Sequence, residues 1–143
     1  MSFDLALERG DIKISADGSM KTVSGNAKLR QDIIKILLTE LGSNKFHPKY
    51  GSYIGALQIG HYADAKLISL DLESSARKAI KNLMSLQRSQ AGKQSLTPGE
   101  LIVDILKVSV ARDQVDPRLY NIFVSVLTKR LTEVRSNVSV RIA

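Results

Sequence analysis

Three runs of alternating apolar and polar residues occupy the last third of the chain, and they constrain the fold more than any other feature. They cover residues 106–110, 120–126 and 138–142. Side chains that recur with a period of two lie on one face of a strand, so each run predicts a strand with one apolar face. Asp116 and Pro117 predict a turn between the first two strands. Together these runs predict a C-terminal antiparallel β-meander.

A helical period precedes the meander. Between residues 65 and 86, apolar residues recur every three or four positions, which predicts one face of a long amphipathic helix. These positions are Ala65, Ile68, Leu72, Ala76, Ala79, Leu83 and Leu86. A shorter helix is expected between Asn26, whose side chain can cap the first turn, and Gly42, which suits a helix end.

The first 25 residues indicate β structure. Short apolar stretches alternate there with turn residues at 9–11 and 16–19, which predicts strand, turn, strand. Between residues 43 and 60 no period holds, and the glycines predict a structured loop with a helical turn around Ile54 and Leu57.

The strands are not interleaved with helices, and this order predicts an α+β fold. We expect a single domain over residues 1–143. It should contain an N-terminal β-hairpin, two main helices and a C-terminal antiparallel β-meander.

The composition excludes several kinds of chemistry. The chain has 143 residues, no cysteine and a net charge of +7. Without cysteine, thiolate catalysis, iron–sulfur clusters and cysteine zinc sites are excluded. No apolar run approaches the roughly 18–20 residues that span a bilayer, and the amino terminus lacks a secretory signal. We therefore expect a cytosolic protein with no membrane partner.

The positive charge does not by itself indicate a nucleic-acid partner. The 21 Lys and Arg residues are spread along the chain, and only 5% of residues are aromatic. Proteins that bind single strands stack bases on aromatic side chains between basic ones, so no nucleic-acid partner is expected. The basic face of the long helix is either solvated or a surface for a protein partner. It consists of Arg77, Lys78, Lys81 and Arg88.

No catalytic arrangement stands out in the sequence. Glycoside hydrolysis needs two carboxylates across a cleft. Glu40 with Glu8 or Asp11 could supply them, but no spacing singles these residues out. His47 and His61 are too few for a usual zinc site. A Ser/His/Asp triad is compatible with the composition, but no nucleophile elbow or phosphate-binding loop occurs. We expect no catalytic residue, no metal and no cofactor.

Two segments are candidates for protein contacts. Phe46, Tyr50 and Tyr53 form an aromatic cluster in the loop, which is either local core or an interface, because tyrosine often anchors interfaces. The last strand, 137–142, offers a second surface. If it lies at a sheet edge, its unpaired N–H and C=O groups invite a strand from another chain.

One block of sequence is more specific than the periodicity. It combines Lys-Leu-Arg-Gln-Asp-Ile at 28–33, Leu-Leu-Thr at 37–39, Gly-Ser at 42–43 and His-Pro-Lys-Tyr-Gly-Ser at 47–52. This block resembles the gene 25-like baseplate wedge family of contractile phage tails, which also includes a baseplate subunit of type VI secretion systems. The specific part covers about residues 22–60, and the order of elements fits over nearly the whole chain.

The resemblance implies a structural protein rather than an enzyme. The expected role is a sheath initiator with six copies per baseplate, in the virion tail, assembled in the host bacterial cytoplasm. The fold would be that of the sheath interlocking domain, whose strands exchange with extensions of the first sheath ring. The implied partners are the tail sheath protein and other baseplate wedge proteins. The residues expected in protein contacts are Val138, Val140, Arg141 and Ile142 in the last strand and Pro48, Tyr50, Gly51 and Tyr53 in the loop.

The chain departs from the family at one place. Family members commonly carry Glu-Pro-Arg just before the C-terminal sheet, where this chain reads Thr97-Pro98-Gly99-Glu100. The alternative function is a tail-associated cell-wall hydrolase of the lysozyme kind.

Overall fold

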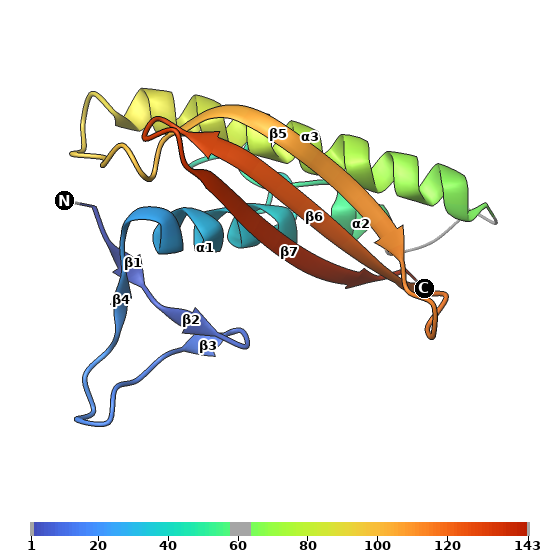
Figure 1. The fold of residues 1–143 in the computed structure, drawn as a ribbon, viewed down its shortest axis with the longest axis horizontal. Helices are drawn as coiled ribbons and strands as arrows, with labels where there is room; N and C mark the ends of the chain where they lie inside the picture. The colour runs from blue at the N-terminus through green and yellow to red at the C-terminus, as the bar shows by residue number, and fades with distance from the viewer. Residues whose placement is uncertain (1, 58–63, 143) are drawn as a thin grey trace.

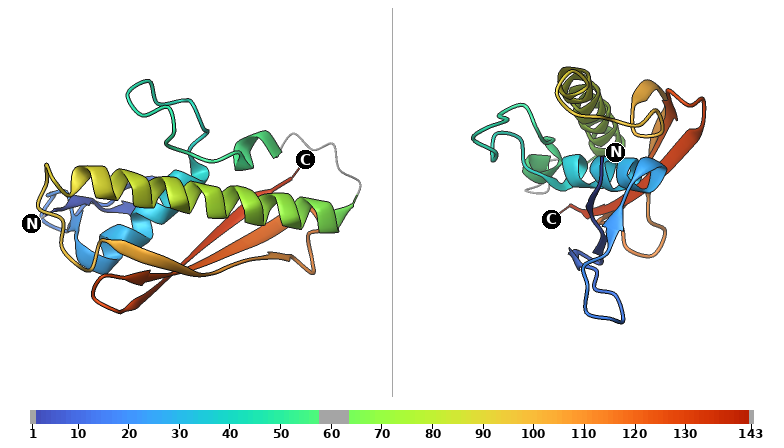
Figure 2. Two further views of the ribbon diagram at one scale, coloured as in Figure 1. Left: turned by 90° about the horizontal axis from the view of Figure 1, so that it is seen from above. Right: turned by 90° about the vertical axis from the view of Figure 1, so that its left-hand side faces the viewer.

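A three-stranded antiparallel sheet carries two helices on one of its faces (Figures 1 and 2). The sheet consists of β5 (Ile102–Arg112), β6 (Leu119–Thr128) and β7 (Glu133–Arg141), in the order β5-β6-β7. The computed structural model describes residues 2–57 and 64–142. The α+β class and the C-terminal meander expected from the sequence are confirmed.

Alternation along β6 and β7 builds the sheet's share of the core. The side chains that point toward the helices are almost fully buried, whereas their neighbours along each strand are half-buried or exposed. The apolar buried positions are Tyr120, Ile122, Val124, Val126, Val134, Val138 and Val140. The period of two in these runs therefore predicts the buried face correctly.

The alternation predicted for β5 is wrong at one position. Leu106 was expected on the same face as Val108, but its side chain is 49% exposed while Val108 is buried. The pairing of β5 with β6 shifts between Ile102 and Asp104 and again between Ile105 and Lys107. Each bulge inserts a residue and moves the following side chain to the other face of the sheet.

The long helix α3 (Ala65–Gln90) packs on β5 and β6. Asp64 caps it, since its side chain accepts a hydrogen bond from the Lys66 N–H. The expected apolar stripe is buried from Ile68 to Leu83, after which Gln87 takes the inward position instead of Leu86. The Gln87 amide is satisfied because it donates to the Glu100 carbonyl at 2.7 Å and accepts from the Ile102 N–H at 3.0 Å.

The helix α1 (Gly25–Leu38) packs mainly against β7 and α3, and its two ends differ from the prediction. Asn26 does not cap it. The N-cap residue is Ser24, whose side chain makes no capping bond, and the Gly25 N–H instead donates to the Glu100 carboxylate at 3.4 Å. The helix ends at Leu38, before Gly42, because Thr39 takes an extended conformation. A carboxylate distant in sequence thus replaces the local cap.

The N-terminal segment is an arm of very short antiparallel pairs rather than one continuous hairpin. Here β1 (Asp4–Leu5) pairs with β4 (Thr22–Val23), and β2 (Leu7–Glu8) pairs with β3 (Asp11–Ile12). The arm extends beside the helices and away from the sheet (Figure 1). Of residues 4–23, Ala6 alone is buried, so the arm adds little to the core.

The loop between α1 and α3 is closed by main-chain bonds. The Ser52 N–H donates to Thr39 O at 2.9 Å, and the Leu41 N–H donates to Ser52 O at 3.1 Å. The short helix α2 (Ile54–Leu57) follows, as predicted for a helical turn there. Among the helices of the described residues, none is long and apolar enough to pass through a membrane.

Candidate functional site

The strand β7 lies at an edge of the sheet, since it pairs with β6 and with no other strand of the described residues. At one end of this pair the Ile142 N–H donates to Arg118 O, and at the other the Thr128 N–H donates to Thr132 O. These bonds place the β6-directed groups at even-numbered positions of β7. The N–H and C=O groups of Asn137, Ser139 and Arg141 therefore point away from β6, as antiparallel pairing requires.

The helix α1 covers one part of this edge. The Arg30 Nε donates to the carbonyl of Arg135 at 3.0 Å, and the Ser136 hydroxyl donates to Arg30 O at 3.3 Å. No backbone bond within the described residues occupies the outward groups from Asn137 to Arg141. The accessible edge is thus the second half of β7.

The side chains and the backbone of the last strand lie in different environments. Val138, Val140 and Ile142 are all buried in the core, with exposures of 5%, 2% and 5%. The Arg141 side chain is exposed and forms an ion pair with Asp116 at 3.0 Å. Side chains of this strand secure it to the domain, while its backbone remains available at the edge.

The loop residues named from the sequence lie against α3, on the helical side of the molecule. Tyr53 is half-exposed, and the Lys78 ammonium lies 5.4 Å from its ring centroid, a cation–π contact. Tyr50 packs against the core, and burial raises the pKa of its phenol. Pro48 is exposed. The loop and the free edge of β7 therefore form separate surfaces.

Gly51 allows the loop to close. Its φ is +128°, and a Cβ there would lie 2.8 Å from the carbonyl oxygen of Thr39. Real side chains do not tolerate that distance, so the close approach of the two backbones requires glycine at this position.

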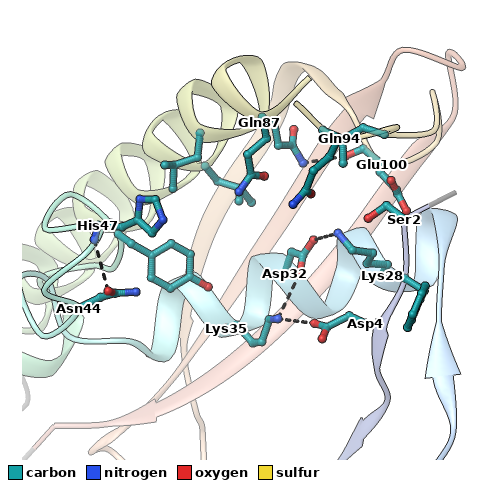
Figure 3. A pocket seen from close by; sticks show the side chains of 16 residues that line it. Ser2, Asp4, Lys28, Asp32, Lys35, Asn44, His47, Gln87, Gln94 and Glu100 are labelled. Carbon is teal, nitrogen blue, oxygen red and sulfur yellow. Dashed lines mark hydrogen bonds and ion pairs between the residues drawn. The ribbon is translucent and has the colours of Figure 1, made fainter. Parts of the chain in front are cut away.

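A polar cavity of about 280 Å³ lies between the loop, α1, α3 and the start of the arm (Figure 3). Lys35 lies between two carboxylates there: its ammonium binds Asp4 of the arm and lies 3.4 Å from Asp32. Lys28 binds the same Asp32 at 2.9 Å. Two positive and two negative charges thus alternate along this wall and balance one another.

The pKa shifts in the cavity follow from this pairing. Burial by itself would raise the pKa of Asp4, but the hydrogen bond and charge of Lys35, with bonds from Leu5 and Gln31, lower it overall. Burial alone would lower the pKa of Lys35, but the bond to Asp4 and the charge of Asp32 raise it. Both groups are therefore held in their charged forms. A general acid at neutral pH needs the opposite shift at its carboxyl group.

Other titratable residues named from the sequence lie elsewhere. Glu8 and Asp11 face each other across the β2–β3 pair of the arm, and Glu40 is exposed beside the loop closure. None of these three residues lines the polar cavity. His47 borders the cavity, and His61 lies outside the described residues. In the part of the chain that the structure describes, no group of three or more His, Asp or Glu side chains is placed to hold a metal ion.

Sequence reasoning missed Asp4, Asp32 and Glu100. The spacing of Lys28, Asp32 and Lys35 at four and three residues on a helix was a readable signal for ion pairs. Nothing local marks Asp4 or Glu100, because both reach their partners from segments distant in sequence.

The fold is shared with a solved structure. The chain superposes with a TM-score of 0.62 on a protein from Geobacter sulfurreducens described as a "putative tail lysozyme", at 13% sequence identity. The match covers 87% of this chain and 97% of the other. No family model and no curated protein matches the chain. At this identity the likeness shows a common fold.

Two expectations from the sequence are affected by this finding. The neighbour is tail-related by its name, which agrees with a tail-related family at that general level and does not distinguish the gene 25-like wedge subunit. The expectation that the chain is not an enzyme is contradicted, because the name of the structural neighbour is that of an enzyme. We withdraw that expectation.

Proposed function

We propose that this chain is a baseplate wedge subunit of a contractile tail, which initiates the sheath by accepting a strand from the sheath protein. The observation that carries the proposal is the free edge of β7. Its outward N–H and C=O groups from Asn137 to Arg141 have no backbone partner within the described residues. The fold shared with a protein named for a tail supports the setting.

The geometry suits strand addition for a physical reason. Main-chain hydrogen bonds provide contact that depends little on side-chain identity. The buried residues Val138, Val140 and Ile142 hold β7 firmly to the domain, so the edge is rigid before a partner arrives. A rigid template loses less conformational entropy on binding than a flexible one.

Removing residues from Asn137 onward would not test this proposal. The deletion takes away three core side chains and is expected to unfold the domain. Proline at Ser139 is a sharper test. The Ser139 N–H points away from β6, so proline removes an outward donor but no bond of the sheet.

We expect the Ser139→Pro protein to remain folded and to enter baseplates, while the number of sheathed particles falls. Electron microscopy of contractile particles that carry the variant measures the number of sheaths, and circular dichroism of the purified variant measures its folding. Ser139→Ala is the matched control, because it keeps the N–H group. Normal sheaths with Ser139→Pro and also with Asn137→Pro would refute strand addition at this edge.

The second candidate function is a tail-associated cell-wall hydrolase. The name of the structural neighbour favours it, and the polar cavity offers two carboxylates, Asp4 and Asp32, on one ammonium group. Hydrolysis of a glycoside requires two carboxyl groups, one of which has a raised pKa and acts as the general acid, and the lowered pKa of Asp4 does not fit that role.

Turnover of purified peptidoglycan by the purified chain tests this candidate. If the chain is a hydrolase of this kind, it should cleave peptidoglycan, and Asp32→Asn should abolish the cleavage. Glu40→Gln, which changes a residue outside the cavity, should leave the cleavage unchanged. Cleavage with these properties would replace the strand-addition proposal as the primary function. The absence of any cleavage would remove the hydrolase candidate.

A further inference from the structure

The helix α1 has a second apolar stripe that the core uses only in part, because Ile34 packs against the core whereas Ala27 and Leu38 are exposed. Its core stripe contains Leu29, Ile33, Ile36 and Leu37. A different side of the helix carries Ala27, Ile34 and Leu38, and Leu38 is 60% exposed. This stripe lines a groove of about 600 Å³, closed on its other side by Leu7 and Val23 of the arm.

This groove borders the free edge of β7 through Arg30. The Arg30 side chain lines the groove, and its Nε binds the outward carbonyl of Arg135 on β7. In Figure 1, α1 and β7 run in the same general direction, and the contact of Arg30 with Arg135 is the point where the groove meets the edge. Leu38 lies eight residues beyond Arg30, ~12 Å along the helix.

The rim of the groove is positively charged. Neither Arg30 nor Arg9, which also lines the groove, forms an ion pair within the described residues. Lys35 is the third cation on the groove, and Asp4 and Asp32 already neutralise it. Two arginine guanidinium groups therefore border an apolar surface, and among the described residues no Asp or Glu lines the groove.

We infer that the strand added to β7 is selected by α1: it places an acidic side chain at Arg30 and apolar side chains over Ile34 and Leu38. This inference rests on the proposed function, because it describes the partner of the same edge. An Asp or Glu at Arg30 would form a charge-assisted hydrogen bond with the guanidinium group. The apolar side chains that alternate with it along the strand would cover a surface now exposed to water.

A second copy of this chain is a poorer occupant than a partner of this chemistry. Its own β7 would bring Arg135 and Arg141 to the groove against a single acidic residue, Glu133. Like charges at close range disfavour such a pairing. The whole chain also carries a net charge of +7, which opposes self-association and attracts an acidic partner.

Photochemical crosslinking identifies the occupant directly. Leu38 is replaced by benzoylphenylalanine in the full chain, particles are irradiated, and the crosslinked peptide is sequenced by mass spectrometry. We expect a peptide of the sheath protein with alternating apolar residues and an Asp or Glu within about four residues of the crosslink. A peptide of another protein, a second copy of this chain, or a sheath segment without a carboxylate would overturn the inference.

Two substitutions test the selectivity independently. Arg30→Glu and Leu38→Glu should each lower the yield of sheathed particles about tenfold or more, because charge reversal or burial of a carboxylate acts at the contact itself. Lys93→Glu is the control for charge, and Leu70→Glu is the control for an exposed apolar residue. Leu70 is 57% exposed on α3, close to the 60% of Leu38, and both controls should leave the yield unchanged.

The outcomes separate this inference from the proposed function. If Ser139→Pro abolishes sheaths while Arg30→Glu and Leu38→Glu do not, strand addition stands and selection by α1 is wrong. If none of these three variants affects sheaths, and Asn137→Pro does not affect them either, both are wrong. Circular dichroism of each variant excludes unfolding as the cause of a loss.

Discussion

Glu100 joins two parts of the chain that are far apart in sequence. Its side chain is 1% exposed, and its carboxylate accepts bonds from the Gly25 N–H at 3.4 Å and the Thr97 N–H at 3.1 Å. A carboxylate at the first turn of α1 also interacts favourably with the positive end of the helix dipole. A residue in the segment before β5 therefore performs the capping expected of Asn26.

At Gly51, substitution by alanine should destabilise the protein. The added Cβ would meet the backbone of Thr39 and Glu40 at 2.8 to 2.9 Å, at a φ that side chains rarely adopt. We expect a loss of ~2 kcal/mol in the free energy of unfolding, measured by denaturant titration. Gly55→Ala is the control, because no atom of the described residues would lie within 4 Å of the added Cβ. Equal stability of the two variants would contradict the prediction.

The ion pair at Asp4 should make the attachment of the arm dependent on pH. The pKa of Asp4 is lowered in the folded protein, so the carboxylate stabilises the fold above the pKa of the unfolded chain. This contribution is lost as pH falls through the lowered pKa of the folded state. Replacing Asp4 with Asn should therefore cost less than about 1 kcal/mol at pH 7, because the pair is partly exposed, and nothing at strongly acid pH.

Denaturation of the wild-type and Asp4→Asn proteins between pH 7 and pH 2 measures that difference. Asp17→Asn is a useful comparison, because the pKa of Asp17 is also lowered, through bonds to Ser19 and with no lysine involved. A stability gap for Asp4→Asn that widens toward low pH would contradict the assignment.

Among the elements, the arm differs most from the rest of the domain. Its β pairs are two residues long, and its larger apolar side chains are exposed. The exposed side chains are Phe3, Leu5, Leu7, Ile12, Ile14 and Met20. Hydrogen bonds from Gln31 to Leu5 O and from the Leu7 N–H to Gln31 attach the arm to α1. Few buried contacts secure it, so its opening should cost little free energy.

Native-state hydrogen exchange tests this difference between elements. The Ala6 and Lys13 amides, bonded within the arm, should exchange by local opening, at a free energy well below that of the Val124 amide in β6. Equal values for the arm and β6 would show that the arm unfolds only with the whole domain.

The whole molecule presents its possible partners with distinct surfaces. The helices cover one face of the sheet, no helix of the described residues lies on the other face, and β7 forms an edge of the sheet (Figure 2). An isologous dimer would use one patch twice, whereas a wedge subunit takes its symmetry from the particle. The proposed function therefore requires a fixed number of copies per particle.

Six copies per contractile particle are expected. Quantitative mass spectrometry of gradient-purified particles, scaled to a known baseplate component, gives this number. Absence of the chain from the particles would contradict its role as a wedge subunit, and peptidoglycan turnover would then be the leading test.

Periodicity in the sequence determined the elements of this protein and most of its buried face. A period of two identified β6 and β7, and a period near 3.6 identified α3 up to Leu83, because a residue's spacing along its own element decides which face it occupies. The contacts between elements were decided only by the tertiary structure. The bulges that expose Leu106, the carboxylate of Glu100 at α1, the position of Arg30 at the β7 edge and the pairing of Asp4 with Lys35 all join residues remote in sequence. No local spacing encodes such contacts, because they depend on how the elements pack against one another.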